Sequence, residues 1–205
     1  NPFYLPYYQT ISLLNNEYYI TKLAKQGLIN IRENLKSKQP FSLEIEVPSI
    51  GGKEIKKVKE KSRVVEMLKK SIRIDLYANS LNTVVSIMEN FLENIIKTVL
   101  MKYPNKLIVE IDYQNKKEIQ EDKKINLRDI LSAKTIEEIF NIIINQRLYK
   151  LFYASPESYF KYFKETIQID LDDDLIATYI EIKATRDLII HNKGIVNSMY
   201  IKKAG

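Results

Sequence analysis

One short stretch of the sequence brings together residue types that can act on a phosphate ester. Arg186, Asp187 and His191 lie in the segment ATRDLIIHNKG, and His191 is the only histidine of the 205 residues. An imidazole exchanges protons near neutral pH, and a guanidinium is a planar cation that matches the geometry of phosphate. The stretch therefore offers a proton-transfer group and a phosphate-binding group.

A helix is predicted to carry these residues. It starts around the acidic residues 172–174, whose charge suits a helix N-terminus, and stops at Gly194. Each helical residue turns by about 100°, so Asp187 and His191 lie on one face and can touch. Arg186 points about 140° away from His191, so that one helix does not easily bring both side chains to a single substrate atom.

The same spacing has a structural interpretation. A histidine in the last turn of a helix, with an aspartate one turn earlier, stabilises that helix by up to roughly 1 kcal/mol through its dipole and an ion pair. On spacing alone this is the simpler interpretation.

A family resemblance favours the functional interpretation. Arg186-Asp187-x-x-x-His191 matches the R-x4-6-H signature of the HEPN superfamily of helical domains, in which a polar residue follows the arginine. Residues 76–96 resemble the core helix of that family, which often carries a glutamate where Glu89 stands. The chain is similar to RiboL-PSP-HEPN and toxin-type HEPN ribonucleases, and this resemblance implies a helical bundle that forms a homodimer.

The resemblance also implies an activity, a metal-independent endoribonuclease that needs no cofactor. His191 is then the general acid or base, Arg186 holds the scissile phosphate, and Asp187 orients the imidazole. Asn192 is expected to add a hydrogen bond, and Glu89 is a candidate for anchoring Arg186. The alternative is a non-catalytic module for dimerisation, protein docking, or nucleotide or RNA binding.

Partners follow from the same resemblance. RNA, either tRNA or mRNA, is the expected substrate, and an antitoxin protein is expected if the chain is a toxin or an antiviral defence effector. The formal charge of +6 and the pI of about 9.2 permit contact with nucleic acid without demanding it. With no cysteine and no long apolar run, the chain is expected to be cytoplasmic and not membrane-bound.

The fold class predicted from the periodicity is mainly α, in one domain over residues 1–205, with a small β insertion. Strands are predicted at 41–47 and 107–113, within the insertions or loops 41–62 and 104–125. Helices are predicted over about 9–38, 64–76, 81–99, 126–132 and 135–148 and from Ser155-Pro156 onward, the second and third being two helices or one broken near residues 79–80. Residues 1–8 are predicted to be extended, and the lysine-rich residues 53–61 to be a solvated segment rather than an RNA-binding patch.

Two other clusters have simpler structural explanations. Aromatic residues and lysines alternate over residues 159–164, which could stack nucleic-acid bases, but a helix that buries its aromatic face explains them more simply. Asp170 and residues 172–174 lack the spacing of a calcium-binding loop and lie where helix-capping aspartates belong, so no metal site is predicted. The sequence contains no phosphate-binding glycine loop, zinc-ligand spacing or nucleophile elbow.

Overall fold

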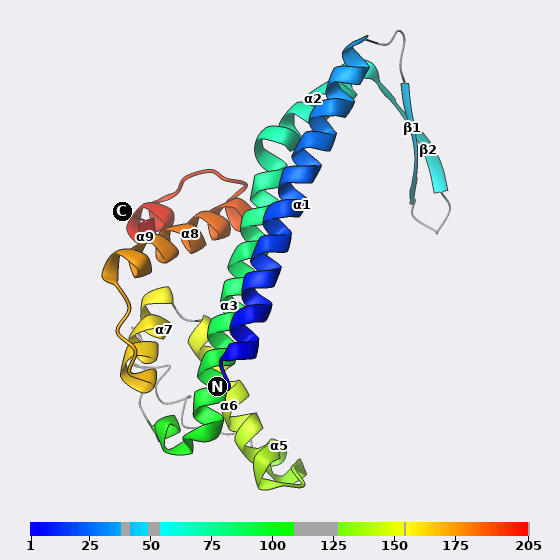
Figure 1. The fold of residues 1–205 in the computed structure, drawn as a ribbon. Coiled ribbons are helices and arrows are strands. Elements are labelled where there is room, and N and C mark those ends of the chain that lie inside the picture. The colour runs from blue at the N-terminus through cyan, green and yellow to red at the C-terminus, as the bar shows by residue number, and fades with distance from the viewer. Residues whose placement is uncertain (38–41, 49–53, 109–126, 154, 205) are drawn as a thin grey trace. The chain divides into compact units, whose positions relative to one another are not determined.

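The computed structural model of this chain describes residues 1–37, 42–48, 54–108, 127–153 and 155–204. Over these residues the chain is mainly helical with a small β insertion, which confirms the predicted fold class (Figure 1). The elements are α1 (Tyr4–Ser37), β1 (Ser42–Pro48), β2 (Glu54–Glu60), α2 (Lys61–Lys70), the π-helix η1 (Ser71–Asp75), α3 (Leu76–Lys102), the 3-10 helix η2 (Pro104–Ile108), α5 (Leu127–Ser132), α6 (Ile136–Tyr153), α7 (Pro156–Tyr162), the π-helix η3 (Phe163–Ile167), α8 (Asp173–Asn192) and α9 (Ser198–Ala204).

The chain divides into two compact units. One contains residues Asn1–Ser12 and Val85–Gly205, and the other contains Leu13–Val84. The residues predicted to form the site all fall in the first unit. No described helix combines the length and the apolar character needed to cross a membrane.

The first helix starts earlier than predicted. Residues 1–8 were expected to be extended because of their two prolines, yet α1 begins at Tyr4. Pro6 fits because it lies in the first turn, where backbone N–H groups have no acceptor within the helix. The rings of Tyr4 and Tyr8, one turn apart, also contact each other, tilted by 49° with centroids 4.4 Å apart.

A strand forms where a solvated segment was predicted. Residues 54–60, expected to be a solvated segment, form β2, which pairs antiparallel with β1. Glu46 lies opposite Lys56, and their charged groups are 3.9 Å apart. The high lysine content of β2 made the segment resemble a solvated loop, so the strand was not predicted. Its partner β1 carries glutamates at alternate positions.

The strand predicted at 107–113 is wrong where the structure can test it. Leu107 and Ile108 belong to the 3-10 helix η2, and residues 109–113 lie outside the described residues. Arg147 of α6 donates a hydrogen bond to the carbonyl of Leu107 at 2.6 Å, which holds the end of η2 against the helical unit.

No break occurs near residues 79–80. Helical structure runs without interruption from α2 through η1 into α3, and the irregularity is the π-helical turn Ser71–Asp75. Thr83 donates to the carbonyl of Asn79 at 3.1 Å, as an interior helical threonine can. The polar pair at 79–80 is therefore accommodated inside α3.

The core of the first unit is built from α3, α6 and the α7–η3 segment. Ile96, Leu100, Ile144 and Leu151 are fully buried there. The aromatic side chains of α7 and η3 join the same core: Tyr159, Phe160, Tyr162 and Phe163. This burial confirms the structural explanation of the 159–164 pattern over base stacking.

Candidate functional site

Helix α8 carries the motif, and its two ends are built as the sequence predicted. At its start the Asp172 carboxylate accepts hydrogen bonds from the backbone N–H groups of Asp174 and Leu175, at 3.0 and 3.1 Å. This is an N-cap and confirms the capping interpretation of that aspartate. At its end Lys193 and Gly194 both have positive φ angles, 53° and 77°. The motif therefore occupies the last two turns of a well-terminated helix.

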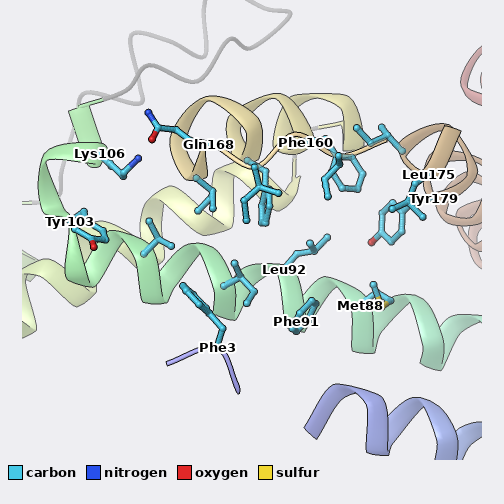
Figure 2. Close-up of a pocket in the computed structure, with 17 residues that line it drawn as sticks. Phe3, Met88, Phe91, Leu92, Tyr103, Lys106, Phe160, Gln168, Leu175 and Tyr179 are labelled. Carbon is cyan, nitrogen blue, oxygen red and sulfur yellow. The ribbon is translucent and has the colours of Figure 1, made fainter. Parts of the chain in front are cut away.

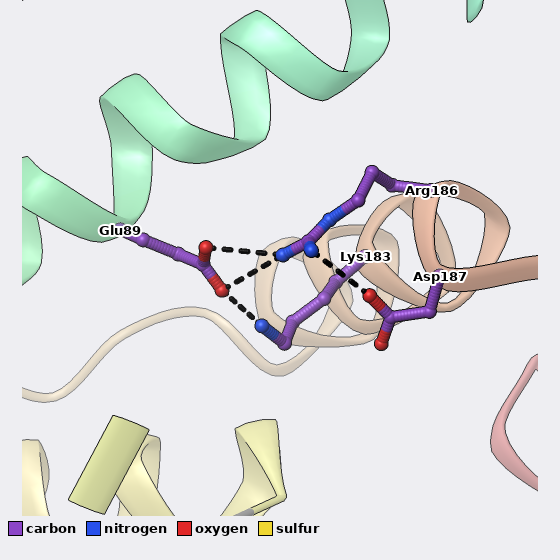
Figure 3. A network of polar contacts seen from close by, with 4 residues as sticks. All are labelled: Glu89, Lys183, Arg186 and Asp187. Atoms are coloured by element: carbon purple, nitrogen blue, oxygen red, sulfur yellow. Dashed lines mark hydrogen bonds and ion pairs between the residues drawn. The ribbon is translucent and has the colours of Figure 1, made fainter. Parts of the chain in front are cut away.

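Arg186 is held by carboxylates on two helices. Its Nη2 lies 3.1 and 3.0 Å from the two carboxylate oxygens of Glu89 on α3, and its Nη1 lies 3.2 Å from Oδ1 of Asp187 (Figure 3). The predicted contact between Glu89 and Arg186 is therefore present. Only 16% of the Arg186 side chain is exposed, so the guanidinium has a defined orientation.

The network has a member that the sequence analysis missed. Lys183 donates to Oε1 of Glu89, the oxygen that also lies near Arg186. Lys183 and Arg186 are three residues apart, which places them on neighbouring parts of one helix face. That spacing was the available signal, but nothing in the sequence paired the face with Glu89, 94 residues earlier.

His191 lies apart from this network. Its side chain is exposed in the last turn of α8, and it forms no hydrogen bond with any described residue. Asp187 was expected to orient the imidazole, but its carboxylate is paired with Arg186 instead. The i,i+4 spacing made the Asp187–His191 contact possible, whereas the side-chain conformations favour the adjacent cation.

Asn192 has a local structural role. Its amide donates to the carbonyl of Ile195 across the turn that follows α8. That bond occupies one donor of the side chain and leaves the amide oxygen available. The structure thus brings together Glu89, Arg186 and Asp187, and it leaves His191 and Asn192 at the exposed end of the helix.

A buried tyrosine, Tyr159, and a half-buried one, Tyr179, lie beside the network. The rings of Tyr159 and Tyr179 meet edge to face, with centroids 6.2 Å apart. Burial is the main cause that raises the pKa of both hydroxyls, and the negative charge of Glu89 adds to this. Both side chains therefore stay neutral well into the alkaline range.

This burial predicts a loss of stability at high pH. The unfolded tyrosine ionises near pH 10.0, whereas the folded Tyr159 remains protonated, so the unfolded state binds fewer protons and is favoured as pH rises. The free energy of unfolding should fall above about pH 10, by at most about 1.4 kcal/mol per pH unit for this residue. Urea denaturation at several pH values measures it, and Tyr159→Phe should flatten the slope. Tyr149→Phe is the matched control, because Tyr149 is 72% exposed; an equal flattening by both would contradict the prediction.

An apolar cavity of about 830 Å³ lies next to these tyrosines, between α3 and the α7–α8 region (Figure 2). Leu92, Phe160, Leu175 and Tyr179 are among the residues that line it. Its lining contains neither the motif residues nor a carboxylate. The cavity therefore offers mainly apolar contacts, with Lys106 as the charged residue of its lining.

Within the described ranges no group of three or more histidine, cysteine, aspartate or glutamate side chains is arranged to hold a metal ion. The charged and proton-transfer groups of the site are the guanidinium of Arg186, the ammonium of Lys183, the imidazole of His191 and the carboxylates of Glu89 and Asp187. Comparison of the chain with models of known protein families, with characterised proteins and with solved structures gave no match.

Proposed function

We propose that this protein is a metal-independent endoribonuclease whose site is completed by a second copy of the chain. The observation that carries the proposal is the fixed guanidinium of Arg186 on the helical turn before an exposed His191. The resemblance of the motif to the R-x4-6-H signature of HEPN ribonucleases supports the same interpretation.

The reaction requires groups of these kinds. The 2′-hydroxyl of a ribose loses its proton to a base and attacks the neighbouring phosphorus, while an acid protonates the 5′-oxygen that leaves. The products are a 2′,3′-cyclic phosphate and a free 5′-hydroxyl. Imidazoles supply the base and the acid, and a guanidinium stabilises the charge that develops on the phosphoryl oxygens.

A second copy of the chain would supply a second histidine and would bring an arginine and a histidine together at one site. Arg186 and His191 point about 140° apart on one helix, and each chain contributes one histidine. A two-fold pair of α8 helices provides two histidines and two arginines in one place. We infer a homodimer for this reason. The proposed substrate is RNA, such as tRNA or mRNA, and the proposed location is the cytoplasm. If the protein is a toxin, an antitoxin protein is a further partner.

One observation favours a second candidate, a non-catalytic module. Arg186 is neutralised by Glu89 and Asp187, so the network also works as a clamp between α3 and α8. In that case the helices serve dimerisation, protein docking, or nucleotide or RNA binding, and His191 has no chemical role. The two candidates differ in whether RNA is cut.

The deciding experiment uses the purified chain and an end-labelled RNA in the presence of EDTA. The endoribonuclease should cut, leave 2′,3′-cyclic phosphate ends and spare an all-deoxy strand of the same sequence. His191→Ala purified in parallel should lose about 10²- to 10⁴-fold in rate, which also excludes a contaminating nuclease. Cutting of the deoxy strand at a similar rate would contradict the mechanism, and absence of cutting across tRNA and mRNA substrates would favour the module.

The pairing of Asp187 with Arg186 makes a separate prediction. In a His191→Ala background, Asp187→Asn should tighten RNA binding about two- to fivefold, because a carboxylate that competes with phosphate for Nη1 is removed. Fluorescence anisotropy of a labelled RNA measures the change. Asp170→Asn is the matched control for net charge, since Asp170 is exposed and paired with Lys164 at 2.5 Å. An equal effect of both changes would mean that only net charge matters.

A further inference from the structure

Lys183 is unusual among the charged residues of the described chain. Among the charged residues of the described ranges it is the one that is buried, with 9% of the residue exposed. Lysine is almost never buried to this extent without a partner, because its ammonium group loses hydration. Here the partner is Glu89, and Lys183 approaches it from the same helix that carries Arg186.

Two cationic side chains, Lys183 and Arg186, share the carboxylate of Glu89. Glu89 accepts from Lys183 through Oε1 and contacts Arg186 through both oxygens. Two cations are thus balanced by Glu89 and by Asp187, and the four groups together are neutral. Without Lys183 the remaining three groups would carry a net negative charge, which repels a phosphate.

The donors of Arg186 are not all used. Nη2 is turned to Glu89, and one N–H of Nη1 is turned to Asp187, which leaves the second N–H of Nη1 for a phosphate; Nε is buried without a hydrogen-bond partner in the described part of the chain and is not open to one. A guanidinium that is to receive a phosphate has to keep donors and positive charge available. A carboxylate that served Arg186 alone would neutralise it more completely than one shared with Lys183.

We propose that Lys183 is a positioning residue for the cleavage reaction. It fixes the Glu89 carboxylate and offsets its charge, so that Arg186 is oriented by Glu89 and still attracts the scissile phosphate. Lys183 itself does not touch the substrate. This role rests on the proposed endoribonuclease function, and it differs from a purely structural ion pair in its effect on substrate binding.

The test compares Lys183→Met, Lys183→Arg, Glu89→Gln and the double variant Lys183→Met/Glu89→Gln. Cleavage of one RNA is measured as kcat and KM, with each rate corrected for the folded fraction from urea denaturation. Lys183→Met should raise KM about tenfold, which corresponds to the loss of roughly 1.4 kcal/mol of attraction for phosphate. Lys183→Arg keeps the charge and should stay within about threefold of the original chain in KM.

The double variant separates positioning from other roles. Because Lys183 acts through Glu89, replacing it in the Glu89→Gln background should change KM less than about twofold. The double variant also replaces a buried ion pair by neutral groups, so it remains informative if Lys183→Met alone does not fold. Lys164→Met removes the same charge from an exposed lysine and should leave KM within about twofold.

Each outcome has one meaning. Lys183→Met with unchanged KM, or with the same effect in both Glu89 backgrounds, would overturn the positioning role while cleavage by the original chain leaves the proposed function standing. An effect of Lys164→Met as large as that of Lys183→Met would overturn it in favour of net charge. Absence of cleavage by the original chain removes the proposed function and this role with it.

Discussion

Replacing Glu89 by alanine should lower the free energy of unfolding by at most about 3–5 kcal/mol, the loss typical of breaking a fully buried ion pair from one side, because the Glu89 side chain is 23% exposed. The stability falls because two cations remain. Lys183 and Arg186 both face Glu89, and their side chains are only 11% and 16% exposed. Removing the carboxylate leaves the two positive groups close together, with Asp187 as the remaining counter-charge of the network.

Urea denaturation followed by circular dichroism measures this loss. Glu93→Ala, one turn further along α3, is the matched control, because no described ion pair depends on Glu93. Glu93→Ala should lower the free energy of unfolding by less than about 1 kcal/mol. A second comparison is Glu89→Ala in the Lys183→Met background, where one uncompensated cation is gone and the loss should be smaller. Equal losses from Glu89→Ala and Glu93→Ala would show that the network adds little stability.

Adding an excess of the His191→Ala protein should inhibit RNA cleavage by the original chain. If two copies make one site and both histidines take part, a mixed dimer has lost either its acid or its base. At a ninefold excess of the variant only about one dimer in a hundred keeps two intact copies, so activity per intact chain falls about tenfold.

The experiment needs time for subunits to exchange and an excess of RNA. The same mixture assayed immediately after mixing is the control, because dimers have not yet exchanged. Excess RNA prevents the variant from acting simply by sequestering substrate. Activity per intact chain that stays constant after full exchange would mean that each copy holds a complete site, which contradicts the composite arrangement.

Features encoded by neighbouring residues were predicted well from the sequence. Asp172 caps α8, and Gly194 has the left-handed conformation expected after a helix end. At the start of α6, which was predicted at residue 135, the N–H of Glu138 donates to Oγ1 of Thr135 at 3.1 Å. Such signals are readable because both partners lie within one turn of each other.

Strand pairing could not be predicted in this way. The residues of β2 are mostly charged, and they become a strand through backbone pairing with β1, with Lys56 opposite Glu46. Leu107 belongs to a segment that alternates like a strand, yet η2 is held by Arg147 from α6. In both cases the segment's structure depends on a partner elsewhere in the chain, β1 or Arg147, and the periodicity of a segment does not predict its partner.

For the site, the sequence by itself determined that Arg186, Asp187 and His191 share one helix and that Glu89 lies on another. Only the tertiary structure decided which of them meet. The packing of α8 on α3 put the Glu89 carboxylate within reach of both Lys183 and Arg186. Asp187 pairs with Arg186 and not with His191. A spacing of four residues permits a contact between Asp187 and His191 without requiring it, so the pairing depends on which charges the fold brings near.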